Sequence, residues 1–391
     1  MNDKRAVLFY LGQFLSAMGS LTFNLCLLAF MPRAGFSLAQ ISLILGLQRF
    51  LPVFVMGVWG HLTDSFSPKL TVAALEIVAG LLSVSLLFVW NESNTNYVLF
   101  LALCVLRATL VNFQTGSRVK ISKILSDGSY QSNAKHAIWQ MKATQGANIF
   151  AGLIGVLLIS FVSLKVAIIL DFLTFVANGV LTFFMPDDES TRQKTGANIS
   201  WSQKFSDHFR FNRQAAILDI ALAVSIMGLV SFFARVSGAD HVWNAFFLTG
   251  YGVAVWLAGF IERSFAKRFS TVPFWFVMGA SFVLLGQVAG PNIESLVLMF
   301  VKDLSYWVIL HRISGHIQND TPVQSIGAVS SARFSMMVVI LSVGEILVGA
   351  WSNTIPLWLE SSVRATIVIC VGLALIINRK TEEVLNDRPA L

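Results

Sequence analysis

Ionisable side chains inside long apolar segments are the residues of this chain whose types and positions could do chemistry. Arg49, Arg107, Asp219, Asp303 and Glu345 each lie within such a segment. A charge in apolar surroundings is costly, so it normally faces a cavity or an opposite charge, and a buried acid can also bind a proton. These residues are therefore either groups that bind protons and ions or members of structural ion pairs.

Three further charges, Glu76, Asp171 and Lys302, complete this set. Glu76, Asp171 and Asp219 lie near the expected ends of their segments, where a structural ion pair or a side chain that reaches the membrane surface is an equally good explanation. Lys302 and Asp303 are neighbours in sequence, and such neighbours do not share a helix face. We therefore expect Lys302 and Asp303 to have different partners.

The sequence has no signature of an enzyme, a metal site or a nucleotide site. No Gly-Lys-Ser/Thr phosphate-binding loop occurs, and the six histidines have no metal-ligand spacing with an acid partner. Cys26, Cys104 and Cys370 all lie in apolar segments, which is typical of packing residues. We therefore predict no enzymatic activity, no metal and no cofactor.

The composition is that of a polytopic membrane protein. Of 391 residues, 55% are hydrophobic and 13% are charged, whereas a soluble domain has about 25% charged residues. A net charge of +7 could indicate a nucleic-acid partner. In a membrane protein it more simply reports basic cytoplasmic loops, so we expect no nucleic acid. The first apolar segment has no small-residue cleavage site after it and is predicted to be a span rather than a signal peptide.

The apolar segments have about the 20 residues that a membrane-spanning helix needs. They are continuous rather than alternating, which favours helices. The predicted fold class is an all-α polytopic membrane protein with twelve transmembrane helices in two six-helix bundles. The predicted spans are Val7–Met31, Ile41–Trp59, Leu70–Trp90, Tyr97–Phe113, Ile138–Val162, Val166–Met185, Ala215–Val236, Trp243–Ile261, Thr271–Ala289, Leu296–Leu310, Phe334–Ala350 and Pro356–Ile377.

A long polar stretch divides these spans into two groups of six. Residues 1–185 are predicted to form an N-terminal six-helix bundle, 186–214 a cytoplasmic linker, and 215–391 a C-terminal six-helix bundle with a short cytoplasmic tail. Lysines and arginines gather on one side of this topology, which places both termini in the cytoplasm. The basic segment Trp201–Phe211 either lies on the inner leaflet or is a solvated linker.

Aromatic and polar side chains on several predicted helices could line a cavity. Phenylalanine is abundant, with 32 residues. Most of these will face lipid or the core, but a subset around a cavity would suit a large, amphiphilic, partly aromatic solute. Polar residues of the first span could donate hydrogen bonds to it. The candidates for contact with a substrate are Gln13, Ser16, Phe23, Asn24, Arg49, Phe113, Phe232 and Trp307.

The stretch Gly60–Lys69 is predicted to be a tight turn between the second and third spans. Gly60 lets two helix ends approach closely, and Asp64 at the membrane surface can cap a helix or pair with an arginine. Lys69 is an inside-facing charge. The pattern Gly-x-Leu-x-Asp-x-x-x-x-Lys resembles the loop signature of the major facilitator superfamily, so Gly60, Asp64 and Lys69 are expected to act in conformational change.

Other segments resemble the macrolide-efflux and enterobactin-exporter branch of that superfamily. They are Leu11–Gly19, Arg49–Pro52 with Gly57 and Gly60, Arg107, Asn133 with Ala134, Leu170–Phe175, and Ile317–Pro322 with Gly327 and Ser330. The loop departs from the family pattern, because Ser65, Ser67 and Pro68 stand where basic residues are usual. The opening span and the loop also resemble those of lysophospholipid transporters.

The resemblance implies two bundles around a central cavity and a secondary transporter that works by alternating access. It implies export of a small amphiphilic organic compound, such as a siderophore or drug, in exchange for protons. Such a protein would act as a monomer, in the lipid bilayer of the bacterial inner membrane. Three alternatives stay open: an importer of siderophore-type solutes, a lysophospholipid transporter, and a non-transporting membrane sensor or scaffold.

Coupling to protons needs an acid whose proton affinity depends on which side of the transporter is open. Asp303 and Asp219 are the first candidates, and Glu345 is the next. Arg107 is expected to hold an anionic group or the deprotonated acid. Because Arg107 and Asp303 lie in corresponding spans of the two halves, we expect them to form an ion pair across the cavity.

Overall fold

The structure, a computed structural model, is helical throughout its regular elements in the part of the chain that it describes. The described residues are 3–91, 95–125, 139, 143, 146–155, 157–159, 163–186, 201–237, 240–265, 270–320, 326–352 and 354–377. The chain divides into two compact units, residues 1–197 and 198–391.

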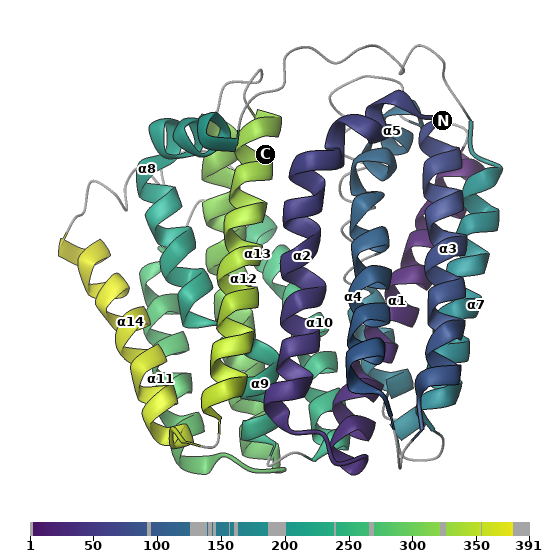
Figure 1. The fold of residues 1–391 in the computed structure, drawn as a ribbon. Coiled ribbons are helices and arrows are strands. Elements are labelled where there is room, and N and C mark those ends of the chain that lie inside the picture. The colour runs from purple at the N-terminus through teal and green to yellow at the C-terminus, as the bar shows by residue number, and fades with distance from the viewer. Residues whose placement is uncertain are drawn as a thin grey trace. The chain divides into compact units, whose positions relative to one another are not determined.

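The N-terminal unit contains a bundle of long helices (Figure 1). Helices α1 and α3 both pack against α7, and α4 packs against α2 and α3. Residues 146–155 and 157–159 are helical as well. The labelled helices are α1 (Asp3–Arg33), α2 (Leu38–Ser65), α3 (Pro68–Val89), α4 (Tyr97–Phe113), α5 (Thr115–Leu125) and α7 (Leu164–Phe183).

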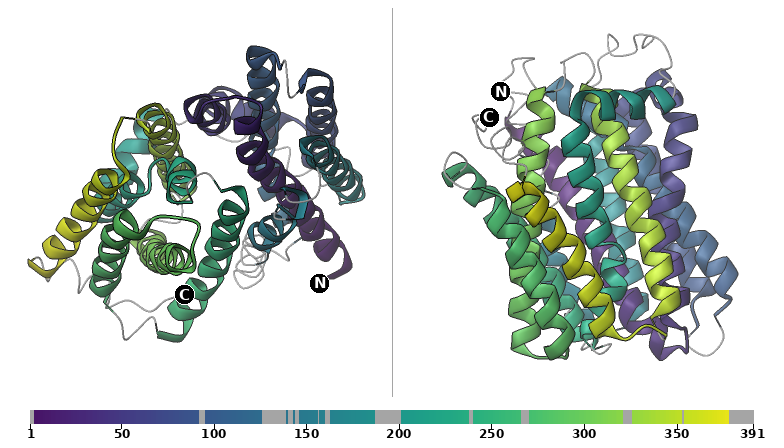
Figure 2. Two further views of the ribbon diagram at one scale, coloured as in Figure 1. Left: turned by 90° about the horizontal axis from the view of Figure 1, so that it is seen from below. Right: turned by 90° about the vertical axis from the view of Figure 1, so that its left-hand side faces the viewer.

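The C-terminal unit is a second helical bundle, whose helices are seen nearly end-on in the left view of Figure 2. Helix α11 packs against α12 and α14, α10 packs against α12, and α8 packs against α13. The labelled helices are α8 (Trp201–Ser225), α9 (Leu229–Val236), α10 (His241–Phe265), α11 (Val272–Val288), α12 (Ile293–Asp320), α13 (Ile326–Trp351) and α14 (Leu357–Ile377).

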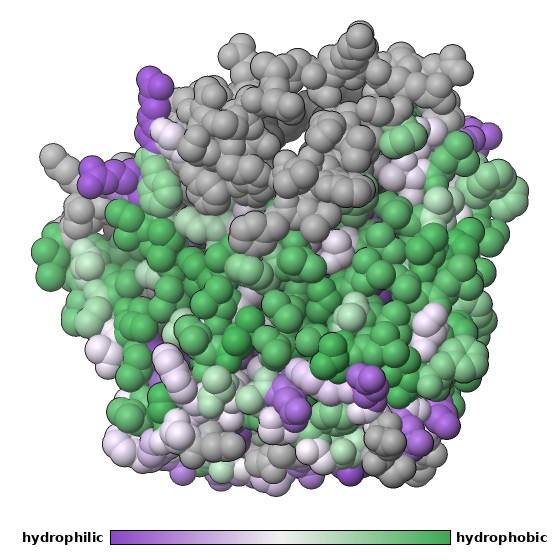
Figure 3. Space-filling view, in the orientation of Figure 1, coloured by the Kyte–Doolittle hydropathy of each residue, from purple (hydrophilic) through white to green (hydrophobic). Residues whose placement is uncertain are grey.

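Length and composition qualify many of these helices as membrane spans. Six described helices are long and apolar enough to cross a bilayer, and the bent pair α8–α9 makes a seventh. Four further apolar helices are shorter, with 10–17 residues. Apolar side chains form a broad band on the face of each unit that is seen in Figure 3, and hydrophilic side chains gather below it, as lipid contact requires. The protein is an integral membrane protein.

Local sequence signals explain where several helices begin. Ser37 and Gln40 form a capping box at the start of α2, in which the Gln40 backbone N–H donates to Ser37 Oγ (3.3 Å) and the Ser37 N–H donates to Gln40 Oε1 (2.9 Å). The side chain of Asn96 caps α4 by accepting from the Leu99 N–H (3.2 Å). Pro68 opens α3, where its missing N–H costs no helical hydrogen bond.

The turn predicted at Gly60–Lys69 is shorter than expected. Helix α2 continues through Ser65, and α3 begins at Pro68, so only Phe66 and Ser67 connect the two helices. Gly60 and Asp64 therefore belong to the last turns of α2, although their side chains lie outside the described ones. The prediction failed because it ended the helix where the polarity rises, whereas helical backbone hydrogen bonds are local and continue beyond the apolar segment.

Close helix packing in the N-terminal unit depends on two glycines of α1. A Cβ atom on Gly19 would lie 2.0 Å from Oγ1 of Thr174 in α7, and one on Gly12 would lie 2.4 Å from Oδ1 of Asn178. These residues are seven apart in α1, so they lie on one helix face. The face allows α1 and α7 to approach closely, which fixes the position of the polar residues that α1 carries.

The segment Trp201–Phe211 is the first part of α8 rather than a separate element. In Figure 1 this part of the helix lies across the end of the C-terminal unit before the helix turns into the bundle. Residues 187–200 of the predicted linker lie outside the described residues, as do Asn133 and Ala134.

Candidate functional site

A buried ion pair joins α4 and α7 in the N-terminal unit. Arg107 Nη1 lies 2.5 Å from Asp171 Oδ2, and the two side chains are 2% and 0% exposed. Two hydroxyl groups complete the contacts of the carboxylate, because Ser83 of α3 donates to Oδ2 (2.7 Å) and Ser20 of α1 donates to Oδ1 (3.3 Å). One buried carboxylate thus connects four helices of the unit.

The guanidinium of Arg107 is also stacked on aromatic rings. It lies 4.4 Å from the ring centroid of Phe23 and 5.6 Å from that of Phe175. A cation over an aromatic face is stabilised by the ring quadrupole, most strongly where water is excluded. Arg107 is therefore held by one acid and by two aromatic rings. Phe23, which was predicted to contact a substrate, is one of these two rings.

A second charged pair in the N-terminal unit joins α3 and α5. Arg118 pairs with the fully buried Glu76. Ser16 of α1 donates to both oxygens of the same carboxylate, at 3.1 and 3.3 Å. Helix α5 was not predicted, because its sequence is too polar to be a span. The signal that could have located this pair is the acid at position 76, which needs a partner.

The C-terminal unit has a comparable pair between α8 and α13. Arg333 donates to both carboxylate oxygens of Asp219, with Nη2 2.9 Å from Oδ1. Its third nitrogen, Nη1, donates to Ser314 Oγ of α12 (2.8 Å). Bidentate pairing of this kind fixes the orientation of both groups. Sequence reasoning found Asp219 but not Arg333.

Lys302 and Asp303 are partners of each other, contrary to the prediction. Lys302 Nζ lies 2.6 Å from Asp303 Oδ1, and the side chains are 0% and 2% exposed. The ammonium group also lies 5.1 Å from the ring centroid of Phe233 and 5.8 Å from that of Phe282. The helix-face rule failed here because the lysine stem has four methylenes, which can bring its charge back to the adjacent carboxylate.

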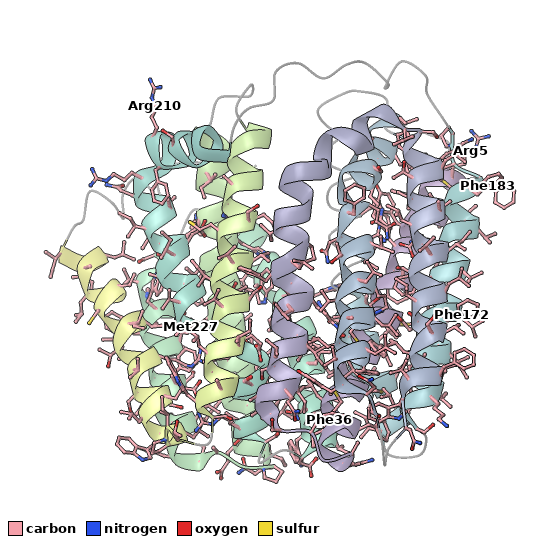
Figure 4. The ribbon with its side chains drawn as sticks, in the orientation of Figure 1. Arg5, Phe36, Phe172, Phe183, Arg210 and Met227 are labelled. Carbon is pink, nitrogen blue, oxygen red and sulfur yellow. The ribbon has the colours of Figure 1, made fainter. Side chains whose placement is uncertain are left out.

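The span predicted at Ala215–Val236 is broken in the structure. Helix α8 ends at Ser225 and α9 begins at Leu229, with a bend of 40°. Gly228 adopts the left-handed conformation at the break (φ 67°, ψ 33°), which glycine populates at no steric cost. A Cβ atom at this position would lie 2.6 Å from Val348 Cβ of α13. Met227, which precedes Gly228, is labelled in Figure 4.

Charged side chains bind both backbone ends at this break. Glu345 of α13 accepts the backbone N–H groups of Val230 (Oε2, 3.1 Å) and Ser231 (Oε1, 2.8 Å) at the start of α9. The Ser231 hydroxyl also donates to Oε1 (2.6 Å). Arg364 of α14 donates to the carbonyl oxygens of Ser225 (2.8 Å) and Met227 (2.6 Å) at the end of α8. Each charge opposes the helix-dipole charge of the end that it binds.

A network of charges continues from Arg364 along α14. Arg364 pairs with Glu360, one helical turn earlier (2.5 Å), and Arg235 of α9 pairs with the same acid. Arg235 also donates to the carbonyl of Ile355. The guanidinium of Arg364 lies 4.8 Å from the ring centroid of Phe232. The sequence signal that could have found Glu360 and Arg364 is their i, i+4 spacing within an apolar segment.

Comparison with known proteins identifies the family of this chain. Residues 9–301, most of the sequence, match the Major Facilitator Superfamily. The chain belongs to the major facilitator superfamily. The protein is therefore a secondary transporter and not an enzyme, and the predicted fold class is confirmed.

Solved structures of other major facilitators match nearly the whole chain. The nucleoside transporter NupG has a TM-score of 0.66 and 14% identity, over 98% of this chain and 99% of that one. A POT family transporter in complex with a thioalcohol-conjugated peptide has a TM-score of 0.73 and 9% identity, over 96% of both chains. A bacterial homolog of the human lysosomal transporter Spinster has a TM-score of 0.65 and 12% identity, over 99% of this chain and 98% of that one. No curated protein sequence matches the chain.

In this major facilitator, Arg107 and Asp303 have partners other than those predicted. Arg107 pairs with Asp171, and Asp303 pairs with Lys302. Each residue thus has a partner in its own unit, and the prediction was wrong because the spacing of spans gives no information on which helices of one bundle exchange charges. The coupling role predicted for Arg107, Asp219, Asp303 and Glu345 stays a prediction.

The predicted substrate contacts have varied surroundings. Ser16 is bound to Glu76, Arg49 is exposed on α2, and Phe232 is buried in the core of the C-terminal unit, 5.8 Å from the Phe282 ring. Trp307 is partly buried between the rings of Tyr251 (5.7 Å) and His311 (5.6 Å). The remaining candidates are buried or partly buried, namely Gln13, Phe23, Asn24 and Phe113, and Lys69 is partly buried in the first turn of α3.

Proposed function

We propose that this secondary transporter exports a small amphiphilic organic compound of the siderophore or drug type, in exchange for protons. Membership of the superfamily makes the protein a transporter, so a non-transporting sensor or scaffold is no longer an alternative. The direction of export is supported by the likeness of Leu11–Gly19 and Arg49–Pro52 to exporter segments. Alternating access between two open states would carry the substrate across the bilayer.

The observation that carries the proton-coupled part of the proposal is the number of ionisable groups inside both bundles. The carboxylates of Glu76, Asp171, Asp219 and Glu345 are all 0% exposed, and Asp303 is 2% exposed. Intramembrane acids are expensive and mark proton or ion pathways in transporters. A protein that carried only uncharged solutes through a passive pore would have no use for so many of them.

Within this proposal, the coupling acid is one of Asp303, Asp219 and Glu345. Protonation of Asp303 or Asp219 would release Lys302 or Arg333 from its pair, and protonation of Glu345 would alter the break between α8 and α9. Arg107 would hold an anionic group, as it holds the carboxylate of Asp171. Each of these changes links proton binding to a change of contacts between helices, which is what coupling requires.

The substrate class is supported by the mixture of side chains that the candidate residues offer. Trp307 lies among the rings of Tyr251 and His311, and such an aromatic group suits a planar or apolar part of a solute. Arg49 is exposed on α2, where its guanidinium is free to bind an anionic group such as a catecholate or carboxylate. Gln13 and Asn24 would add hydrogen bonds.

Location and orientation are part of the same proposal. The distribution of lysines and arginines in the sequence places both termini and the linker 186–214 in the cytoplasm of a bacterial inner-membrane protein. The domain boundaries at 185 and 215 and the monomeric state are proposed with it.

Proteoliposomes test the proposal directly. The purified protein is reconstituted with an imposed pH gradient, and a macrolide, a catecholate siderophore and ethidium are added in turn while a pH-sensitive dye reports proton movement. We expect at least one probe to move protons in the opposite direction and to accumulate against its gradient, relative to protein-free liposomes. Substrate uptake without any proton movement would contradict proton antiport.

The two alternatives that remain are an importer of siderophore-type solutes and a lysophospholipid transporter. Inside-out and right-side-out membrane vesicles from expressing cells distinguish import from export, because the proton gradient drives uptake into only one of them. A labelled lysophospholipid added to the same vesicles tests the second alternative. Accumulation of the probes in right-side-out vesicles would replace export by import.

A further inference from the structure

We propose that residues 201–212, the leading part of α8, form a surface helix that binds the anionic phospholipid headgroups of the leaflet at which they lie. The sequence left two descriptions of Trp201–Phe211 open, a segment on the inner leaflet and a solvated linker. The structure favours the membrane, and the charges of the segment indicate the chemistry of its partner. This lipid contact concerns neither the transported solute nor protons, so it does not depend on the proposed function.

The leading part of α8 lies where a membrane span begins. The apolar part of the helix, which contributes to a candidate span together with α9, starts at Arg213. Residues 201–212 precede it within the same helix. In Figure 1 they lie across the end of the C-terminal unit and not along its bundle. A helix that lies across the end of a span is at the depth of the headgroups.

One face of this leading part is aromatic and the opposite face is polar. Trp201, Phe205 and Phe209 are spaced by four residues, so they share one face of the helix. Successive residues turn by about 100°, which places Gln203 and Arg210 on the other side. The Phe209 side chain is 37% exposed, and Arg210 is exposed and points away from the unit in Figure 4. This division is typical of helices that lie in a membrane interface.

A solvated linker does not explain the aromatic residues. Four of the eleven residues from 201 to 211 are aromatic, namely Trp201, Phe205, Phe209 and Phe211. Segments that stay in water are poor in aromatic side chains, because exposing these side chains to water is unfavourable. Tryptophan and phenylalanine at the boundary between headgroups and acyl chains are removed from water while the helix stays near the surface. The aromatic face therefore favours the membrane over the solvent.

The charges of the segment favour an anionic partner. Lys204, Arg210 and Arg213 are basic, whereas Asp207 is the one acidic residue from 201 to 214. The first turn of α8 contains no acid, so the positive end of the helix dipole adds to the charge of Lys204. Arg210 and Arg213 are exposed. Basic side chains on an interfacial helix are attracted to anionic phospholipids, and each strengthens the contact about fivefold.

Spin labels on the full-length protein in lipid nanodiscs test the depth of the segment. One label is attached through Phe205→Cys on the aromatic face, and its matched control through Gln203→Cys on the opposite face. Both variants carry Cys370→Ser, because Cys370 is exposed whereas Cys26 and Cys104 are buried. The discs contain an equal mixture of phosphatidylglycerol and phosphatidylcholine. Collision of each label with oxygen, which concentrates in lipid, is compared with its collision with a water-soluble nickel complex.

We expect the label at position 205 to collide more with oxygen and the label at position 203 to collide more with the nickel complex. Equal and high access of both labels to the nickel complex would show a solvated segment. Shielding of the label at position 205 from both reagents would show that the aromatic face packs against protein. Either of these two results would overturn the inference.

Charge variants test the chemistry of the lipid. In discs whose phosphatidylglycerol content gives comparable embedded and free populations of the label at position 205, Lys204→Gln or Arg213→Gln should lower the ratio of embedded to free label about fivefold. Lys204→Arg keeps the charge and should keep the ratio, which separates charge from helix packing. Lys165→Gln removes an exposed charge from α7, in the N-terminal unit, and should leave the ratio unchanged. An embedded fraction that is the same in pure phosphatidylcholine discs and is indifferent to Lys204→Gln and Arg213→Gln would overturn the assignment of an anionic lipid.

Discussion

The Arg107–Asp171 pair offers the sharpest test of how charge is stabilised inside the N-terminal bundle. Replacing Arg107 by Met keeps an unbranched apolar side chain against Phe23 and Phe175 but removes the cation. Asp171 then keeps only the hydroxyl groups of Ser83 and Ser20. Removing one partner of a buried ion pair costs about 3–5 kcal/mol, since the remaining charge is left uncompensated. We expect Arg107→Met to destabilise the protein by that amount.

The double variant identifies the cause of this loss. Asp171→Asn alone leaves Arg107 buried without a carboxylate and should also cost about 3–5 kcal/mol. In Arg107→Met/Asp171→Asn no charge remains, and the amide oxygen can still accept from Ser83. The double variant should therefore be more stable than either single variant. The interaction energy should be about 3 kcal/mol, at the upper end for residues in direct contact.

Chemical denaturation in detergent micelles measures these four free energies of unfolding. The matched control is Arg33→Met, an exposed arginine that stacks on Phe30 at 5.0 Å and should change stability by less than about 1 kcal/mol. Effects of Arg107→Met and Asp171→Asn that simply add would refute the buried-pair argument. Arg107→Met combined with Asp303→Asn should instead be additive to within about 0.5 kcal/mol, because each has its own partner.

Three further predictions concern the break, the loop and the orientation. Gly228→Ala should lower stability by about 2–4 kcal/mol in thermal unfolding, from its positive φ and its overlap with α13. Gly250→Ala should instead raise stability by about 0.5–1 kcal/mol, because its added Cβ atom would meet Leu296 Cδ1 at 3.9 Å, an ordinary van der Waals contact. Asp64→Asn should slow turnover in flux assays and leave probe affinity unchanged, because Asp64 at the membrane surface is expected to stabilise one closed state and not to contact the substrate. A pure loss of binding would argue against this. In intact cells, a cysteine introduced as Ser190→Cys should resist an impermeant maleimide, and efficient labelling would reverse the predicted orientation.

The positions of most helices could be predicted because hydropathy reports directly on lipid contact. Helix α4 has the predicted bounds Tyr97–Phe113, and the predicted span Leu70–Trp90 differs from α3 by two residues or fewer at each end. Helix α12 extends from Ile293 to Asp320, well beyond the predicted Leu296–Leu310. Hydropathy could not indicate this extension, because polar residues continue a helix as readily as apolar ones do once it leaves the bilayer.

The break between α8 and α9 was missed for a related reason. Gly228 lies in an apolar sequence that is long enough to span, and a single glycine within a span is common. What breaks the helix is tertiary, since α13 packs against the left-handed residue and Glu345 and Arg364 bind the freed backbone groups. No local pattern in residues 213–236 contains that information.

The acids of the site could be predicted, but their partners could not. Asp171, Asp219 and Glu345 could be identified because a charge within an apolar segment is costly and is expected to have a partner or a function. Arg118 and Arg333 are far in sequence from Glu76 and Asp219, the acids with which they pair, and neither arginine was recognised as a buried charge. Pairing is a property of which helices pack together, and that is determined by the whole bundle rather than by the spacing of charges.

Buried charge bridges helices in both bundles, and in the C-terminal unit it also binds a break within one span, which bears on where motion occurs. In the N-terminal unit both acids bind side chains of other helices, so Asp171 and Glu76 fix the positions of whole helices relative to one another. In the C-terminal unit, Glu345 and Arg364 bind backbone groups at a break within one span. Side chains that bridge intact helices resist bending, whereas contacts to loose helix ends can be exchanged without breaking a helical hydrogen bond. Bending during transport should therefore be concentrated at Gly228 and α9, and the N-terminal unit should move as a rigid bundle.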